Sequence, residues 1–293
     1  MTFSTSSETK ERLWIITKMK NKLDMKIGSL NPVLRNVINL MLRLLTTNQT
    51  LLLNQSKPEE WLHIYTSGKT LKSVDDSFTV GRQIVDKYML QFQRNNRWEW
   101  LMQFGKHSPE QYDFFNKFFA AQGIDSHEFA VCIYNWLMCT HHKKNTLFLY
   151  GPPNTGKTFL ARLLTDVFMC GNMNLKGVTS DFYYEVLLNK SVAVMEELWV
   201  IPSVIDDFKS ILSGASMDIN QKHMPMQRLE RLPVVITCNH SNLGRGFVSP
   251  IDEEALQNRC YKYRLNYNVT DMLNCHVSVS GFADWLLINY EKE

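Results

Sequence analysis

Apolar positions recur with helical spacing through roughly the first 140 residues of the chain. Asn31 and Pro32 mark a helix start, and the following apolar side chains fall on one face: Val33, Val37, Leu40, Met41, Leu44 and Leu45. Further helices are predicted at 58–62, 80–104, 109–119 and 126–137, with a looser stretch rich in Ser, Thr, Lys and Asp at about 66–79. The pattern predicts an all-helical N-terminal region.

After position 145 the pattern changes to short, continuous apolar runs that have the length of buried strands. These runs are 146–150, 191–195 and 233–237. Residues 159–168, after the first run, return to helical spacing, and 217–220 with 227–231 form a predicted hairpin. Strands that alternate with helices predict an α/β fold.

Residues 151–158 read GPPNTGKT and lie between the first predicted strand and the helix after it. Strand, glycine loop and helix is the context of a phosphate-binding loop, in which backbone N–H groups and the positive end of the helix dipole bind polyphosphate. Lys157 is expected to contact the β- and γ-phosphates, and the Thr158 hydroxyl to hold Mg²⁺. The alternative is an ordinary glycine turn before a helix.

The expected ligands are therefore ATP, as the nucleoside triphosphate, and Mg²⁺. The residues predicted to bind them are consecutive: Gly151, Pro152, Pro153, Asn154, Thr155, Gly156, Lys157, Thr158 and Phe159.

Polar residues end the other two predicted strands. Glu196 and Glu197 follow the second strand, where one carboxylate, expected to be Glu196, would order Mg²⁺ and the other would polarise the attacking water. Asn239 follows the third strand and would sense the γ-phosphate or orient that water. Ligands of open α/β sheets bind at these carboxyl ends. Alternatively, the glutamates are a solvated surface pair and the asparagine caps a turn.

The predicted hairpin places Lys222 and His223 near its tip. A cation and an aromatic ring on an exposed tip suit a nucleic-acid backbone. A solvated turn remains the alternative.

Composition excludes several classes of protein. The formal net charge of +3 requires any nucleic-acid binding to come from a local basic surface, and 44% hydrophobic residues are sufficient for a large core. Six cysteines without a CxxC pair indicate reduced thiols. Neither the N-terminal sequence nor any apolar stretch predicts secretion or a membrane span.

Five segments, in this order and approximate spacing, resemble the motifs of superfamily 3 helicases: GPPNTGKT, VMEELW, SGASMDINQKH, LPVVITCN and ALQNRCYKY. The likeness is greatest to the helicase domain of the parvovirus large non-structural (replication) protein. It begins near Gln111, includes NWLMCTHHKKNTLFLYGP ahead of the loop, and continues to Asp284 and Trp285, about three fifths of the chain.

The resemblance implies a P-loop, AAA+-like domain with a central, mostly parallel sheet, preceded by an all-helical N-terminal region. The implied division is a helical region at 1–105, a helical bundle or oligomerisation segment at 106–145, and the ATPase core at 146–293.

The family's functional residues carry over to matching positions of this chain. Lys157, Thr158, Glu196, Glu197 and Asn239 take the roles given above. Lys222 and His223 would contact single-stranded DNA from a hairpin in the channel of a ring. Arg259 resembles the arginine finger that reaches the ATP of a neighbouring subunit, with Arg245 in reserve; the alternative for Arg259 is a salt bridge to Asp252, Glu253 or Glu254.

The implied function is an ATP-dependent DNA helicase of 3′ to 5′ polarity that acts in viral-type replication as a ring, usually a hexamer, with the nucleus, that of the host for a viral gene, as its compartment. The resemblance also leaves viral capsid proteins or host replication proteins as candidate partners. The alternatives are a DNA-packaging ATPase motor and a captured viral, non-catalytic interaction protein.

Two features depart from the family pattern. Relatives often carry a second lysine two residues after the first on the hairpin, where this chain has Met224. The family's full-length proteins also carry a nuclease with an HxH metal motif, which this sequence lacks.

Overall fold

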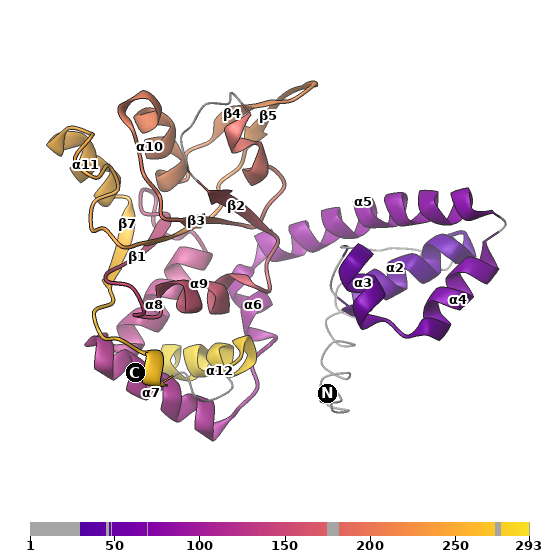
Figure 1. Cartoon of the computed structure of the whole chain (residues 1–293), viewed down its shortest axis with the longest axis horizontal. Helices are drawn as coiled ribbons and strands as arrows, with labels where there is room; N and C mark the ends of the chain where they lie inside the picture. Colours follow the sequence, from indigo (N-terminus) through magenta and orange to yellow (C-terminus); the bar gives the residue numbers. More distant parts are fainter. Residues whose placement is uncertain are drawn as a thin grey trace. The chain divides into compact units, whose positions relative to one another are not determined.

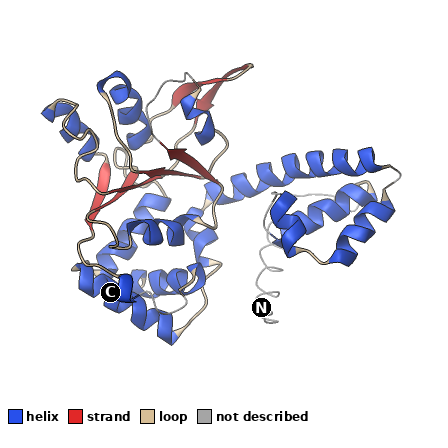
Figure 2. Ribbon diagram, viewed as in Figure 1, coloured by secondary structure: helices blue, strands red, loops and turns tan. Residues whose placement is uncertain are grey.

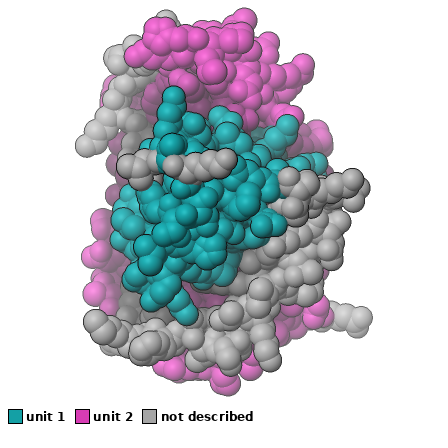
Figure 3. All heavy atoms as spheres, turned by 90° about the vertical axis from the view of Figure 1, so that its right-hand side faces the viewer, with its two compact units in different colours: residues 1–95 teal, residues 96–293 magenta. Residues whose placement is uncertain are grey.

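The computed structural model describes residues 30–44, 47, 49–68, 70–174, 182–272 and 277–292. Internal contacts divide the chain into two units, residues 1–95 and 96–293 (Figure 3). The described part of the first unit is all-helical, and the second unit contains the sheets (Figure 2).

Four helices form the described part of the first unit: α2 (Pro32–Leu44), α3 (Gln49–Gln55), α4 (Pro58–Ser67) and α5 (Leu71–Asn95). The apolar face predicted for α2 is confirmed, because Val37 and Met41 are fully buried. Gly81 of α5 lies against Val37, so the two helices pack closely. The prediction of a looser stretch at 66–79 was wrong: the 25-residue helix α5 begins at Leu71, and Lys72, Asp75, Asp76 and Thr79 lie on its exposed side.

The second unit is built on a five-stranded parallel sheet in the order β2-β3-β6-β1-β7 (Figure 1). Its strands are β1 (Thr146–Tyr150), β2 (Cys170–Asn174), β3 (Val192–Glu196), β6 (Val234–Cys238) and β7 (Cys260–Arg264). The three predicted strands β1, β3 and β6 are adjacent and confirmed, as is the predicted α/β fold class. The pattern missed the two outer strands, β2 and β7.

Helices cover both faces of the sheet. Figure 1 shows α9 (Lys157–Thr165) below it, with α7 (Pro109–Gln122), α8 (Ser126–Leu137) and α12 (Val279–Tyr290) beyond, and α10 (Ile205–Ser213) above. Side chains alternate along each strand, so Phe148 and Ile236 pack with Phe208 of α10. The predicted aromatic stripe of α7 is core, with Phe119 stacked on Trp285 of α12 at 4.4 Å between ring centroids.

The remaining elements connect these layers. They are α6 (Arg97–Met102), α11 (Pro250–Gln257), the hairpin strands β4 (Met217–Gln221) and β5 (Met224–Leu229), and the short 3₁₀ turns η2 (Tyr183–Leu187), η3 (Pro202–Val204) and η4 (Thr270–Met272).

Five of the six cysteines lie in the described ranges, and all five are free thiols. Cys275 lies outside the described residues. Burial raises the pKa of the Cys260 thiol to about 12, as expected for a structural rather than a reactive cysteine. Among the described helices, none combines the length and the apolar character needed to span a bilayer.

Candidate nucleotide site

The predicted phosphate-binding loop connects β1 to α9 and has the backbone of such a loop. Gly151 and Gly156 have φ of 141° and 87°, where a residue with a side chain is strained. A Cβ atom at Gly151 would lie 1.9 Å from the Leu265 carbonyl oxygen, so only glycine fits there. Asn154, the third loop residue with positive φ (63°), is of a type that tolerates this conformation.

The Lys157 ammonium turns back onto the loop. It donates to the carbonyl oxygens of Gly151 (2.9 Å) and Pro152 (2.6 Å), and the side chain is buried. Burial lowers the pKa of Lys157, and the negative charge of Glu197 partly offsets that effect. The loop therefore holds a buried positive charge at the start of a helix, where the dipole also favours an anion.

The strand order brings the predicted polar residues to one edge of the sheet. β6 lies between β1 and β3, with Tyr150 opposite Cys238 and Glu196 opposite Thr237. The residues that follow these strands, Gly151, Asn239 and Glu197, are therefore neighbours. Backbone hydrogen bonds between the strands continue past their ends. The Gly151 N–H donates to the Cys238 carbonyl (3.2 Å), and the Glu197 N–H donates to the Thr237 carbonyl (2.7 Å).

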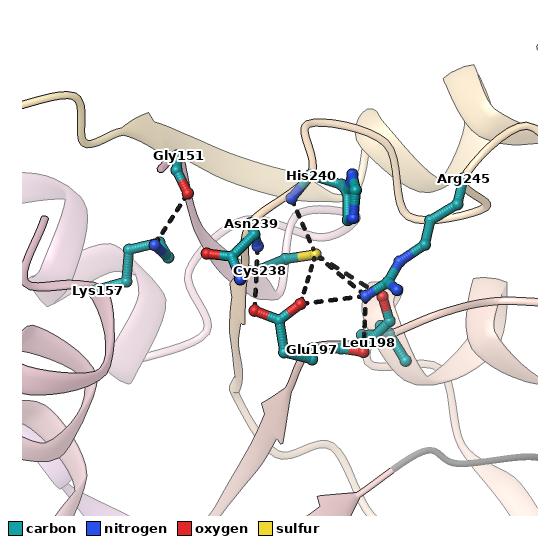
Figure 4. A network of polar contacts seen from close by, with 8 residues as sticks. All are labelled: Gly151, Lys157, Glu197, Leu198, Cys238, Asn239, His240 and Arg245. Atoms are coloured by element: carbon teal, nitrogen blue, oxygen red, sulfur yellow. Dashed lines mark hydrogen bonds and ion pairs between the residues drawn. The ribbon is translucent and has the colours of Figure 1, made fainter. Parts of the chain in front are cut away.

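Glu197 is the centre of a polar network at this edge (Figure 4). Its carboxylate accepts the Asn239 N–H at 3.2 Å and forms an ion pair with Arg245 at 3.2 Å. The Arg245 guanidinium also lies over the Trp199 ring, 5.9 Å from the centroid. In the view of Figure 4, Asn239 lies between Lys157 and Glu197. Lys157, Glu197 and Asn239 are thus gathered at one site, while their catalytic roles stay predictions.

A cavity of about 390 Å³ lies over the loop. One wall is Asn154 to Phe159, which includes six of the nine predicted nucleotide-binding residues, and the other is Val269 and Thr270. Pro152 and Pro153 are exposed on the loop outside this lining. This volume is in the range of small-molecule sites.

The residues predicted to hold Mg²⁺ suit a metal that arrives with the nucleotide. Among the described residues, no group of three His, Cys, Asp or Glu side chains forms a complete metal cage. Thr158 and Glu196 are both exposed and offer a hydroxyl and a carboxylate oxygen. Magnesium bound to phosphates needs only one or two such protein ligands. The donor set therefore fits the ion.

The predicted hairpin forms, with β4 and β5 antiparallel and Lys222 and His223 between them. Both tip residues are exposed, and His223 has a φ of 60°. Met224 and Met226 on β5 are also exposed, at 66% and 67% of their full surface. The tip thus presents one lysine, one histidine and two thioethers to solvent, and its role in binding DNA stays a prediction.

Arg259 lies between α11 and β7, and its carbonyl accepts the N–H of Asn145 just before β1, at the opposite end of the strands from the Glu197 network. Its Nε donates to the Lys209 carbonyl at 2.8 Å, and a terminal nitrogen donates to the Ala255 carbonyl. Within the described part of the chain it forms no ion pair, and Asp252 pairs instead with Lys209 at 2.8 Å. The role of Arg259 toward a neighbouring subunit stays a prediction.

Two contacts of this site had no signal in the sequence. The resemblance offers Arg245 only as the reserve finger, whereas in the structure it pairs with Glu197 of its own chain. Gln122, at the end of α7, contacts the loop residue Thr155 and the backbone at Tyr267, 33 and 145 residues away in sequence. Only an alignment or a structure reveals such a distant contact.

The model of the family described as "Parvovirus non-structural protein NS1" matches residues 63–276. "Initiator protein NS1" of human parvovirus B19 (isolate AU) is 33% identical over 108 residues, which are 36% of this chain and 16% of that protein. "Protein Rep52" of adeno-associated virus 2 is 25% identical over 155 residues, 51% of this chain and 38% of that protein. The chain thus spans well under half the length of these relatives.

A solved structure, "The X-ray structure of JCV Helicase", aligns with 99% of this chain and 87% of its own, with a TM-score of 0.50 and 16% identity. At this identity the likeness shows a shared fold.

Proposed function

Because the chain belongs to the family of the parvovirus non-structural protein NS1, we propose that it is an ATP-dependent DNA helicase of superfamily 3. The observation that carries the proposal is the meeting of the phosphate-binding loop with Glu197 and Asn239 at the carboxyl ends of three adjacent parallel strands. This is where open α/β sheets bind their ligands.

Each group at the site has a distinct part in hydrolysis. Loop N–H groups and the Lys157 ammonium bind the phosphates. Glu197 accepts a proton from the attacking water, and Asn239 orients that water. Thr158 and Glu196 hold Mg²⁺, which when bound neutralises charge on the phosphate oxygens. Lys157 leaves its carbonyl partners for the phosphates when ATP binds, since its three ammonium hydrogens are the donors in both cases.

We further propose that copies of the chain form a ring, a hexamer as is usual in the family, in which Arg259 reaches the ATP of the neighbouring copy. Lys222 and His223 would contact single-stranded DNA in the channel, and hydrolysis would move the hairpins along the strand from 3′ to 5′. The proposed setting is viral-type replication in the nucleus, with capsid or host replication proteins as further partners.

DNA-stimulated ATP hydrolysis tests the site. We expect Lys157→Ala to lower turnover about a hundredfold or more, the loss typical of removing one preorganised electrostatic contact. Lys117→Ala is the matched control, because Lys117 is an exposed lysine of α7 whose partner is Asp113. Turnover that survives Lys157→Ala would overturn the site, and hydrolysis without strand separation on forked DNA would contradict the helicase proposal.

A further inference from the structure

Gln122 is the last residue of α7, and its side-chain amide lies between the phosphate-binding loop and the segment 266–270 that follows β7. Its Nε2 donates to the carbonyl oxygens of Thr155 (3.2 Å) and Tyr267 (2.9 Å). Its Oε1 accepts the N–H groups of Asn266 (2.8 Å) and Tyr267 (3.0 Å). One side chain therefore binds both segments.

These four bonds use the full capacity of the amide. The NH₂ group has two hydrogens and the oxygen has two lone pairs. One hydrogen goes to the loop and the other to the segment, while both lone pairs bind the segment. Neither a carboxylate nor a shorter amide can reproduce this pattern, because a carboxylate has no hydrogens to donate and asparagine lacks one methylene.

The two segments that Gln122 joins lead directly into the walls of the cavity. Residues 154–159 form one wall, and Val269 and Thr270 form the other. A second bond crosses between them, from the Val269 N–H to the Asn154 carbonyl at 3.0 Å. Phe118, one helical turn before Gln122, lies against Gly156. Helix α7 thus supports the loop with an aromatic ring and the amide together.

The bond to Thr155 also fixes an N–H group of the loop. In a trans peptide the carbonyl and the following N–H point in opposite directions. All described peptide bonds are trans, so the Thr155 carbonyl facing Gln122 turns the Gly156 N–H away from Gln122. Gly156 is itself one of the residues that line the cavity.

We propose that Gln122 is a positioning residue for nucleotide binding: it sets the spacing between the phosphate-binding loop and the segment 266–270, and it fixes the orientation of a loop N–H. The inference rests on the proposed function, since it concerns how the same site binds a triphosphate. Gln122 itself touches neither the phosphates nor the reacting atoms.

Two substitutions at Gln122 separate the loss of its hydrogen bonds from the effect of a negative charge in its place. Gln122→Met keeps the size and removes all four hydrogen bonds. Gln122→Glu keeps the acceptor and replaces both donors with a carboxylate that faces the Thr155 and Tyr267 carbonyls. We expect KM for ATP to rise about tenfold in the methionine variant, as for the loss of one to two net hydrogen bonds, and further in the glutamate variant. We expect kcat to change by less than KM, because the loop binds phosphates before and during hydrolysis alike.

Gln111→Met is the matched control. Gln111 lies on the same helix, and its Oε1 also accepts two hydrogen bonds, from the N–H and hydroxyl of Ser278, both at 3.0 Å. The substitution removes a comparable contact without touching the loop or segment 266–270. We expect it to lower the thermal unfolding temperature to a similar degree and to leave KM unchanged.

The outcomes are separable. An unchanged KM in Gln122→Met or Gln122→Glu, with normal activity of the unsubstituted chain, overturns the inference alone. An equal rise in KM in Gln111→Met also overturns it, because the effect would then come from a general loosening of α7. If the unsubstituted full chain fails to bind a fluorescent ATP analogue, the proposed function and this inference are both overturned.

Discussion

At the scale of single residues, the ion pair of Glu197 and Arg245 joins two non-glycine residues that both have a left-handed backbone, with φ of 51° and 48°. Such a conformation costs about 1–3 kcal/mol per residue and persists where surrounding contacts enforce it. Here backbone hydrogen bonds to Thr237 and from Asn239 hold Glu197 in place. The Glu253 carboxylate accepts the N–H groups of the two residues before Arg245, Leu243 and Gly244. Two of the six described non-glycine residues with positive φ therefore pair at the proposed catalytic site.

The buried ammonium of Lys157 predicts that ATP binding is linked to a proton. Burial lowers the pKa of Lys157 in the free protein, whereas bound phosphate favours the charged form. As pH rises through the lowered pKa, the free protein loses the proton that the complex retains, so affinity falls and binding takes up a proton. Titration calorimetry between about pH 8 and pH 10, in buffers of different ionisation enthalpy, measures this uptake.

Lys157→Arg is the control for this linkage, because a guanidinium stays charged throughout that range. We expect the arginine variant, whatever its affinity, to show the same binding enthalpy in both buffers. Equal enthalpies for the unsubstituted chain at every pH would contradict a lowered pKa at Lys157.

The residues that the sequence identified at this site were those with a local signal. Gly151 and Lys157 belong to an eight-residue motif. Glu197 directly follows β3, and Asn239 directly follows β6. The pairing of Arg245 with Glu197 depends on how a loop folds back over the sheet. Gln122 joins two segments whose contacts lie 33 and 145 residues away from it in the sequence. No local pattern predicts such contacts.

At the scale of elements, the strands that could be predicted are those buried on both faces. The central strands β1, β3 and β6 are continuous apolar runs, as expected for the middle of a parallel sheet. The edge strands lack that pattern, because β2 reads CGNMN and β7 reads CYKYR. The helix predicted at 80–104 begins too late, because the first turns of α5 are rich in Ser, Thr and Asp, residues with low helix propensity.

The hairpin gives a prediction at this scale. Single-stranded DNA binding weakens with salt, with a slope of log K against log salt of about −0.7 for each neutralised phosphate. Met224 is exposed beside Lys222 and His223, so Met224→Lys adds a cation to the tip without removing a buried contact. We expect tighter binding at low salt and a slope steeper by about 0.7 for each hairpin that contacts the strand.

Fluorescence anisotropy of a labelled oligonucleotide over a salt series measures that slope. Leu62→Lys is the matched control, since Leu62 is exposed at 65% on α4 and the variant has the same net charge. Lys222→Ala is expected to make the slope shallower by a similar amount. If Leu62→Lys steepens the slope as much as Met224→Lys, the effect reflects net charge, and the hairpin is not the DNA contact.

At the scale of the whole molecule, the family match extends over residues 63–276 and so includes parts of both units. The all-helical character of the first unit and the α/β character of the second followed from the change in hydrophobic period near residue 145. The boundary between the units, at residues 95 and 96, does not coincide with that change, because α6, α7 and α8 pack on the sheet-containing unit. Packing partners of amphipathic helices are not encoded in their spacing.

Whether Arg259 or Arg245 acts as the arginine finger across a subunit interface can be tested by mixing two inactive variants. A Lys157→Ala copy lacks a working nucleotide site but retains Arg259, whereas an Arg259→Ala copy retains the site. If Arg259 acts across an interface, an equal mixture regenerates complete interfaces where the two copies meet in the right order, about a quarter of them for random mixing in a ring. We expect ATP hydrolysis to recover toward that fraction, measured after joint refolding or prolonged incubation.

Mixing Lys157→Ala with Arg245→Ala is the matched control, because Arg245 pairs with Glu197 of its own chain. Both substitutions then damage the same site in cis, and no interface in the mixture is complete, so we expect no recovery. Recovery with Arg245→Ala and none with Arg259→Ala would assign the finger to Arg245. The cis ion pair would then have to open for Arg245 to reach a neighbour, and its guanidinium would exchange a carboxylate for a phosphate, which is the exchange that a bidentate, permanently charged group makes most readily.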